Sequence, residues 1–310
     1  MSKSMSLLWA ALLICMTACK KEQAIQDSKL SPVTTARKAA SPLLKSIEYG
    51  TDWSGTVQIA IVTSYTTGTD LQLDVKVPDG YALIGGGAVA SPLVSTSAAF
   101  LTAAYPDLDY TTWHAASTDH MHTFVHTLYG YAIGLKVTGM TKQELTSNMW
   151  LFSNTSSVAS HPATSVTIEN AYTLIGGGAK VASDANLLVY SYPYGTSWFA
   201  ASKDHEVSAP ASITAYALGL KTAVLEQKNL EVVRDSIATV TSGGISSASI
   251  FADTTWVAGS PGALATYKGA GRMLQGIAPH LQDATVTSKD LDVSDSGTTA
   301  VYALKIRKKK

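Results

Sequence analysis

The sequence predicts an all-β protein built from three internal repeats of about 85 residues. Three observations support this fold class. Thr, Ser, Val, Tyr and Gly are well represented and runs of Glu, Lys and Gln are scarce, which is typical of strands and turns. Several separate blocks of sequence recur in the same order along the chain. The last block of each repeat alternates along a strand with a period of two, so that every second side chain shares one face.

Residues 1–18 are predicted to be a secretory signal peptide. Lys3 supplies a positive start, and residues 7–16 are apolar but too few to cross a bilayer as a helix. The segment ends in Met16-Thr17-Ala18-Cys19, which resembles the bacterial lipobox. This resemblance implies that Cys19 is lipidated and becomes the mature N-terminus, anchored in a membrane.

Residues 19–53 are predicted to form a flexible tether, because they are polar, contain two prolines and show weak periodicity. Lys20-Lys21-Glu22 resembles the charged tether of surface lipoproteins of the Bacteroidota. The resemblance implies an outer-membrane lipoprotein exposed at the cell surface, with a periplasm-facing lipoprotein as the alternative. Cys15 leaves with the signal peptide and Cys19 carries lipid, so we expect no disulfide.

The three predicted repeats cover residues 54–139, 140–224 and 225–310. The block YALIGGGA (81–88) returns as YTLIGGGA (172–179), and YAIGLK (131–136) returns as YALGLK (216–221). The third repeat is degenerate, but it keeps a Ser-Lys-Asp block and the same spacing of 12 residues from that Asp to a Tyr. Three sheets around one axis, as in a β-prism, or three tandem β-sandwiches would suit this pattern.

The glycine triplets in the first two repeats are interpreted as structural. A phosphate-binding loop needs a strand before it and a helix N-terminus after it, and no helical pattern follows either triplet. We therefore expect strand bulges or close strand packing at residues 85–87 and 176–178.

A further strand is written almost identically twice, as WHAASTDH (113–120) and WFAASKDH (198–205). The Asp of this block occurs in all three repeats, which favours a role in a turn. The final His is replaced by Leu291 in the third repeat, so the fold does not need a histidine there. The histidines are therefore candidates for function.

The first repeat is rich in histidine, with four of the seven histidines of the chain between residues 114 and 126. Spacing of two along a strand places side chains on one face, which is a common arrangement for metal ligands. The sequence offers no cysteine or acidic partner in register, so we expect neither a metal nor a cofactor. The weak candidates for metal ligands are His120, His122 and His126.

Aromatic rings, carboxylates and imidazoles gather near the predicted strand ends, where they suit contacts with sugars or proteins. The predicted ligand contacts are Trp113, His114, His120, Tyr192, Tyr194, Lys203, Asp204 and His205. Any catalytic group is expected among Tyr105, Asp119, His120 and His122.

Three functions remain open. The first is a lipid-anchored binding protein for a glycan or another surface macromolecule, which would bind through the first two repeats. The second is a polysaccharide lyase or glycoside hydrolase with its site in the first repeat. The third is a structural or adhesion scaffold. A formal net charge of zero gives no basic field for nucleic acid, so no nucleic-acid partner is expected.

Overall fold

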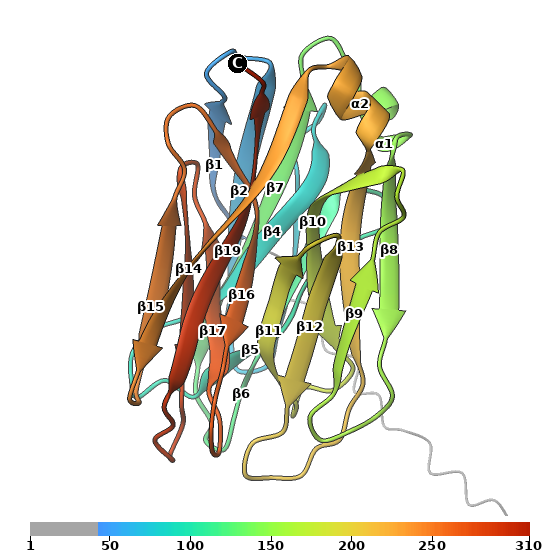
Figure 1. The fold of residues 1–310 in the computed structure, drawn as a ribbon. Helices are drawn as coiled ribbons and strands as arrows, with labels where there is room; N and C mark the ends of the chain where they lie inside the picture. Colours follow the sequence, from blue (N-terminus) through green and yellow to red (C-terminus); the bar gives the residue numbers. More distant parts are fainter. Residues whose placement is uncertain (1–42) are drawn as a thin grey trace, which may run out of the picture. The chain divides into compact units, whose positions relative to one another are not determined.

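The computed structural model describes residues 43–310 as three antiparallel β-sheets with two short helices (Figure 1). The predicted all-β class is confirmed. The signal peptide, Cys19 and residues 19–42 of the predicted tether lie outside the described residues. Within residues 43–310, no helix is both long and apolar enough to cross a membrane.

The sheets are named I, II and III and are given in strand order. Sheet I contains β1 (Leu43–Thr51), β2 (Val57–Gly68), β7 (His126–Val137), β4 (Ala82–Ser91), β17 (Met273–Pro279), β18 (Asp283–Lys289) and β15 (Ser246–Phe251). Sheet II contains β3 (Leu71–Lys76), β6 (Thr112–Asp119), β5 (Ala99–Pro106), β10 (Tyr172–Val181), β13 (Ile213–Lys221) and β8 (Met149–Thr155). Sheet III contains β14 (Leu230–Thr241), β19 (Gly297–Lys308), β16 (Val257–Ala265), β11 (Leu187–Tyr194), β12 (Ser197–Lys203) and β9 (Ala163–Thr167).

Every sheet combines strands from two of the predicted repeats. Sheet I joins β2, β7 and β4 to β17, β18 and β15, which come from the other end of the chain. Sheets II and III join corresponding groups of three strands, through β5–β10 and β11–β16. Tandem sandwiches would keep the strands of each repeat together, so that alternative is wrong. The number and bounds of the repeats stay a prediction.

Strand β1 corrects the predicted tether. Residues 43–51 pair with β2 along the edge of sheet I instead of forming a flexible linker. Nearly all of their side chains are exposed, so neither face of β1 carries the apolar alternation that predicts a strand. The strand is held by backbone pairing with β2, and no pattern in its side chains predicts this pairing.

The middle strands β4, β10 and β16 approach one another closely, and glycine makes this possible. A Cβ atom on Gly85 would collide with Ser260, and one on Gly176 would collide with the backbone of Ile84. The pairing register shifts at the same place in all three strands. The expected bulges and close packing are therefore found at the glycine triplets.

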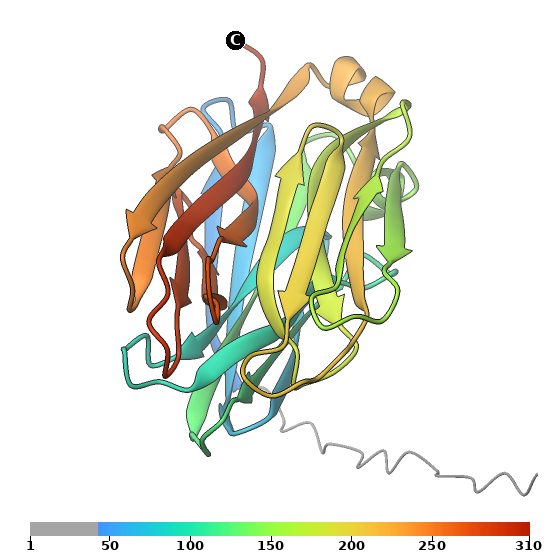
Figure 2. The same cartoon turned by 60° about the horizontal axis from the view of Figure 1, so that its bottom comes forward.

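The two helices lie at one end of the sheets, near the C-terminus (Figure 1). Helix α1 (Lys142–Thr146) begins with a capping box between Thr141 and Glu144, and α2 is Thr222–Gln227. At the opposite end lie the β6–β7, β12–β13 and β18–β19 loops, and this end is called the loop end (Figure 2). A small apolar cluster around Phe100, Leu187 and Met273 fills it.

Candidate functional site

The repeated aspartates at the loop end shape turns. Asp119, Asp204 and Asp290 each accept a hydrogen bond from the backbone N–H five residues later, at 3.1, 3.2 and 2.8 Å. The turn interpretation is therefore confirmed. These carboxylates hold the loop backbone, which is a structural role for Asp119 and Asp204.

The two repeated tryptophans belong to the core. Trp113 and Trp198 are each 1% exposed, and their indole N–H groups donate to Gly87 O at 3.1 Å and Ser191 Oγ at 2.8 Å. The prediction that Trp113 contacts a ligand is wrong, because a ring enclosed on all sides cannot reach one. Both rings pack over a glycine of the triplets, Gly86 and Gly177, where a Cβ would overlap the indole.

His120 and His205 meet inside the loop end, so the structure does not support them as direct ligand contacts. Their rings lie edge to face at 5.3 Å, and His120 Nε2 is 3.0 Å from the carbonyl oxygen of His205. Both residues are buried, and burial lowers the pKa of His205 so that it is neutral near pH 7. Neither ring nitrogen of His205 has a hydrogen-bond partner within the described residues.

The three weak metal candidates do not converge. His120 contacts His205, His122 contacts Asp292 at 3.2 Å, and His126 binds Ser117 Oγ at 2.7 Å and Phe124 O at 3.0 Å. Across residues 43–310, no group of three or more His, Cys, Asp or Glu is placed to hold a metal ion.

Lys203 is also buried, and its prediction as a ligand contact is wrong. Its ammonium donates to Ala270 O and lies 4.4 Å from the centre of the Tyr267 ring. Burial lowers the pKa of Lys203. This hydrogen bond connects Lys203 to the β16–β17 loop, and the side chain does not reach the surface.

A row of stacked rings crosses the outer face of sheet II. Tyr105 stacks on Tyr216 at 5.2 Å and on His114 at 4.8 Å between ring centres. Tyr216 lies opposite Gly178 in the β10–β13 pairing, and a Cβ on Gly178 would collide with the backbone of Tyr105. The missing side chain of Gly178 therefore lets two tyrosines meet across β10. We call Tyr216, Tyr105 and His114 the sheet II row.

Sheet III carries a row at the corresponding positions. Tyr192 stacks on Tyr302 at 4.7 Å and on Phe199 at 5.7 Å, with Tyr302 opposite Gly262. We call these three residues the sheet III row. Tyr194, 62% exposed, extends it beyond Phe199, and the Arg234 guanidinium lies 5.1 Å from the centre of the Tyr194 ring. The structure thus brings the predicted contacts Tyr192 and Tyr194 together at the surface.

Sheet I has the same backbone positions without the row. Tyr131 lies opposite Gly87, as Tyr216 and Tyr302 lie opposite their glycines, but the two neighbouring positions hold Ala278 and Thr285. This face folds without the additional rings. The rows on the other two sheets are therefore not a requirement of the fold.

A shallow groove of about 100 Å³ borders the sheet II row. His114 Nδ1 is 2.7 Å from an Asp74 carboxylate oxygen, and the Lys180 ammonium is 5.2 Å from the centre of the Tyr105 ring. Burial raises the pKa of Tyr105, so its hydroxyl stays protonated near neutral pH. This groove unites Tyr105 and His114, which the sequence predicts, with Asp74 and Lys180, which it does not.

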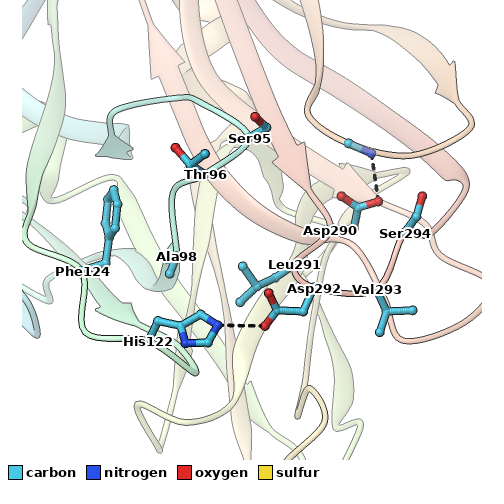
Figure 3. A pocket seen from close by; sticks show the side chains of 11 residues that line it. Ser95, Thr96, Ala98, His122, Phe124, Asp290, Leu291, Asp292, Val293 and Ser294 are labelled. Carbon is cyan, nitrogen blue, oxygen red and sulfur yellow. Dashed lines mark hydrogen bonds and ion pairs between the residues drawn. The ribbon is translucent and has the colours of Figure 1, made fainter.

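A larger cavity, of about 380 Å³, lies at the loop end between the β4–β5, β6–β7 and β18–β19 loops (Figure 3). We call it the end pocket. His122 and Asp292 point toward each other at one side of it, from loops 170 residues apart in sequence (Figure 3). Its lining residues are Ser95, Thr96, Ala98, His122, Phe124, Gly244, Asp290, Leu291, Asp292, Val293 and Ser294.

A scan against protein-family models matches no family, and a search of the curated proteins finds no similar sequence.

Proposed function

We propose that this chain is a glycan-binding protein that holds its ligand on the outer faces of sheets II and III. The observation that carries the proposal is the pair of aromatic rows at corresponding positions, set against sheet I, which folds with Ala278 and Thr285 there. Half-exposed rings that the fold does not require are best explained by a contact outside the chain.

The geometry of the rows favours recognition of sugar hydroxyls. Rings that stack on one another share their faces, so they offer a ligand mainly edges and tyrosine hydroxyl groups. Burial raises the pKa of Tyr105, Tyr192, Tyr216 and Tyr302, which keeps these hydroxyls protonated and able to donate. In the sheet II groove, Asp74 and Lys180 add an acceptor and a donor.

Two similar faces on one chain suit a long polymer. Each face alone offers few contacts, but one chain of repeated sugars can occupy both, so the second contact forms at a high effective concentration. A lipid on Cys19 would hold such a protein at the outer membrane, exposed at the cell surface, where a polysaccharide partner is accessible. The periplasm-facing alternative would use the same faces.

A polysaccharide lyase is the second candidate, and the sheet II groove is the observation that favours it. The hydrogen bond from His114 Nδ1 to Asp74 fixes the tautomer whose Nε2 is a base. Lys180 supplies the cation that a lyase needs near the developing charge. A lyase would then use His114 and Tyr105 rather than His120, which is buried.

The experiment uses the full chain in detergent, a glycan array and pull-down on insoluble polysaccharides. We expect the Tyr105→Ala/Tyr192→Ala double variant to bind at least about tenfold more weakly than the wild type. Tyr131→Ala, at the sheet I position that corresponds to Tyr216 and Tyr302, is the control and should bind like the wild type. Melting temperatures check that all three proteins are folded.

The outcomes separate the three functions. Binding that depends on the rows, without product, supports the proposal. Release of unsaturated uronates that stops in His114→Ala would make the protein a lyase. Equal retention by all variants, or no retention of any glycan by the wild type, would overturn the proposal and favour a scaffold.

A further inference from the structure

We infer that the end pocket is a second site, separate from the rows, that holds a single neutral sugar residue. A cavity of about 380 Å³ lies within the size range of small-molecule sites. The inference rests on the proposed glycan binding and deepens it, because it adds a site for one sugar unit to faces that suit a chain.

The lining of the end pocket suits a polyol with one apolar face. Phe124, Leu291 and Val293 supply apolar surface, while Ser95, Thr96 and Ser294 supply hydroxyl groups (Figure 3). Sugars present the same combination of C–H faces and hydroxyls. A neutral ligand follows from the limited charge of the accessible groups, which include one carboxylate beside one imidazole.

The two carboxylates of the pocket have different roles. Asp290 accepts from the N–H groups of Gly244 at 2.9 Å and Asp295 at 2.8 Å, and it lies 3.8 Å from the buried guanidinium of Arg272. These contacts engage it within the protein. The Asp292 side chain is 41% exposed and contacts His122, whose side chain is itself 66% exposed. Asp292 is therefore the acceptor that a ligand can reach.

The corresponding place beside the β16–β17 loop is held by contacts that the end pocket lacks. There Asp295 accepts from the N–H groups of Lys268 and Gly269, both at 2.9 Å, and holds the β16–β17 loop down. Tyr267 of that loop packs against Lys203 and, edge to face, against His161.

At the end pocket the position of Asp295 is taken by Phe124, which has no acceptor for loop amides. The β4–β5 loop is held from beneath by Lys289, whose ammonium donates to Ser95 O at 2.7 Å and to Ser97 O. Lys203 holds the β16–β17 loop in the corresponding way, so the difference between the two places lies at Phe124, which lines the pocket where Asp295 holds a loop.

The test measures binding of free glucose, galactose, mannose and N-acetylglucosamine to the full chain in detergent by saturation-transfer NMR. We expect at least one of these sugars to bind, and Asp292→Asn to raise its Kd about tenfold or more. Glu206→Gln is the matched control, because Glu206 has the corresponding left-handed backbone (φ 59°, against 57° for Asp292) but lies outside the pocket. It should bind like the wild type.

The Tyr105→Ala/Tyr192→Ala variant separates this inference from the proposed function. If it keeps monosaccharide binding and loses polysaccharide retention, the two sites are distinct. If no monosaccharide binds, or if binding is lost in this variant and unchanged in Asp292→Asn, the inference is overturned. Retention of polysaccharide through the rows would then still stand. A Phe124→Asp variant, which restores the loop-holding carboxylate, should close the pocket and abolish monosaccharide binding.

Discussion

At the loop end, the first and third predicted repeats use different side chains to hydrogen-bond a buried serine hydroxyl and a loop carbonyl. Near β7, His126 binds Ser117 Oγ and Phe124 O. At the corresponding place near β19, Arg272 donates to Ser288 Oγ at 3.4 Å and to Asp295 O at 3.0 Å, although it comes from the loop just before another strand, β17.

Among the described residues of the second predicted repeat, only the loop carbonyl has a side-chain donor. The Asn186 amide donates to Ala209 O at 3.0 Å, and Ser202 Oγ is left without a hydrogen-bond partner within residues 43–310. The fold thus fixes which buried oxygens need a donor, and the sequence supplies a titratable imidazole, a permanent cation or a short amide. Stability at the loop end should differ accordingly.

The largest effect is expected from removing the cation. Arg272→Leu should lower the free energy of unfolding by about 3–5 kcal/mol, because it leaves several buried oxygens without donors and Asp290 without its partner. Urea denaturation measures the change. Arg234→Leu, at an exposed arginine, should stay within about 0.5 kcal/mol of the wild type. A loss below about 1 kcal/mol for Arg272→Leu would contradict the comparison.

The imidazole should matter less than the guanidinium. His126→Leu removes two hydrogen bonds and no permanent charge, so we expect a loss of about 1–3 kcal/mol. The same urea titration compares it with His280→Leu, where the histidine is exposed and the loss should be negligible. Equal losses in the two variants would show that the buried hydrogen bonds of His126 contribute nothing.

Acid should lower the stability of the folded protein through two buried histidines of the loop end. Burial lowers the pKa of His126 and His205, so both are neutral in the folded protein near pH 7. Their contribution to stability is complete above the unfolded pKa of about 6.5 and is lost as pH falls through the lower folded values. Melting temperatures of His126→Leu/His205→Leu should therefore fall less between pH 7 and pH 5 than those of the wild type. His205→Leu copies Leu291, so parallel curves would refute this account.

The smallest effect is expected at the unpaired hydroxyl. Ser202→Ala should change the free energy of unfolding by less than about 0.5 kcal/mol or stabilise the protein slightly, because the hydroxyl is buried without a partner. Ser288→Ala removes the 2.6 Å contact with Thr299 Oγ1 and should cost about 1 kcal/mol. Chemical denaturation of the pair decides, and a larger loss in Ser202→Ala would reverse the ranking.

Local patterns predicted the local structure well. Strand composition and alternation gave the fold class, and the recurring Asp and glycine blocks indicated turns and close packing. Alternation does not say which face of a strand looks outward, however. Trp113, His120 and His205 were therefore placed at a ligand although they are buried. The capping pair of helix α1, Thr141 and Glu144, was visible in the sequence and was missed.

The groups that complete the candidate sites could not be predicted, because they depend on pairing between distant parts of the chain. Lys180 reaches Tyr105 because β10 pairs with β5, through Lys180 and Ala103. Asp292 reaches His122 across loops from opposite ends of the sequence. No spacing within one repeat encodes such neighbours.

Because each sheet combines strands from two predicted repeats, the sheets can be completed only in a certain order during synthesis. A chain that emerges from its N-terminus can complete sheet II as soon as β13 is available, because that sheet needs nothing beyond residue 221. Sheets I and III wait for β17 and β19, so the large loop between β4 and β17 closes near the end of synthesis. Until then β4 and β11 each lack one neighbouring strand and are prone to wrong pairing, which makes the last third of the chain the step that commits the whole protein to its native state.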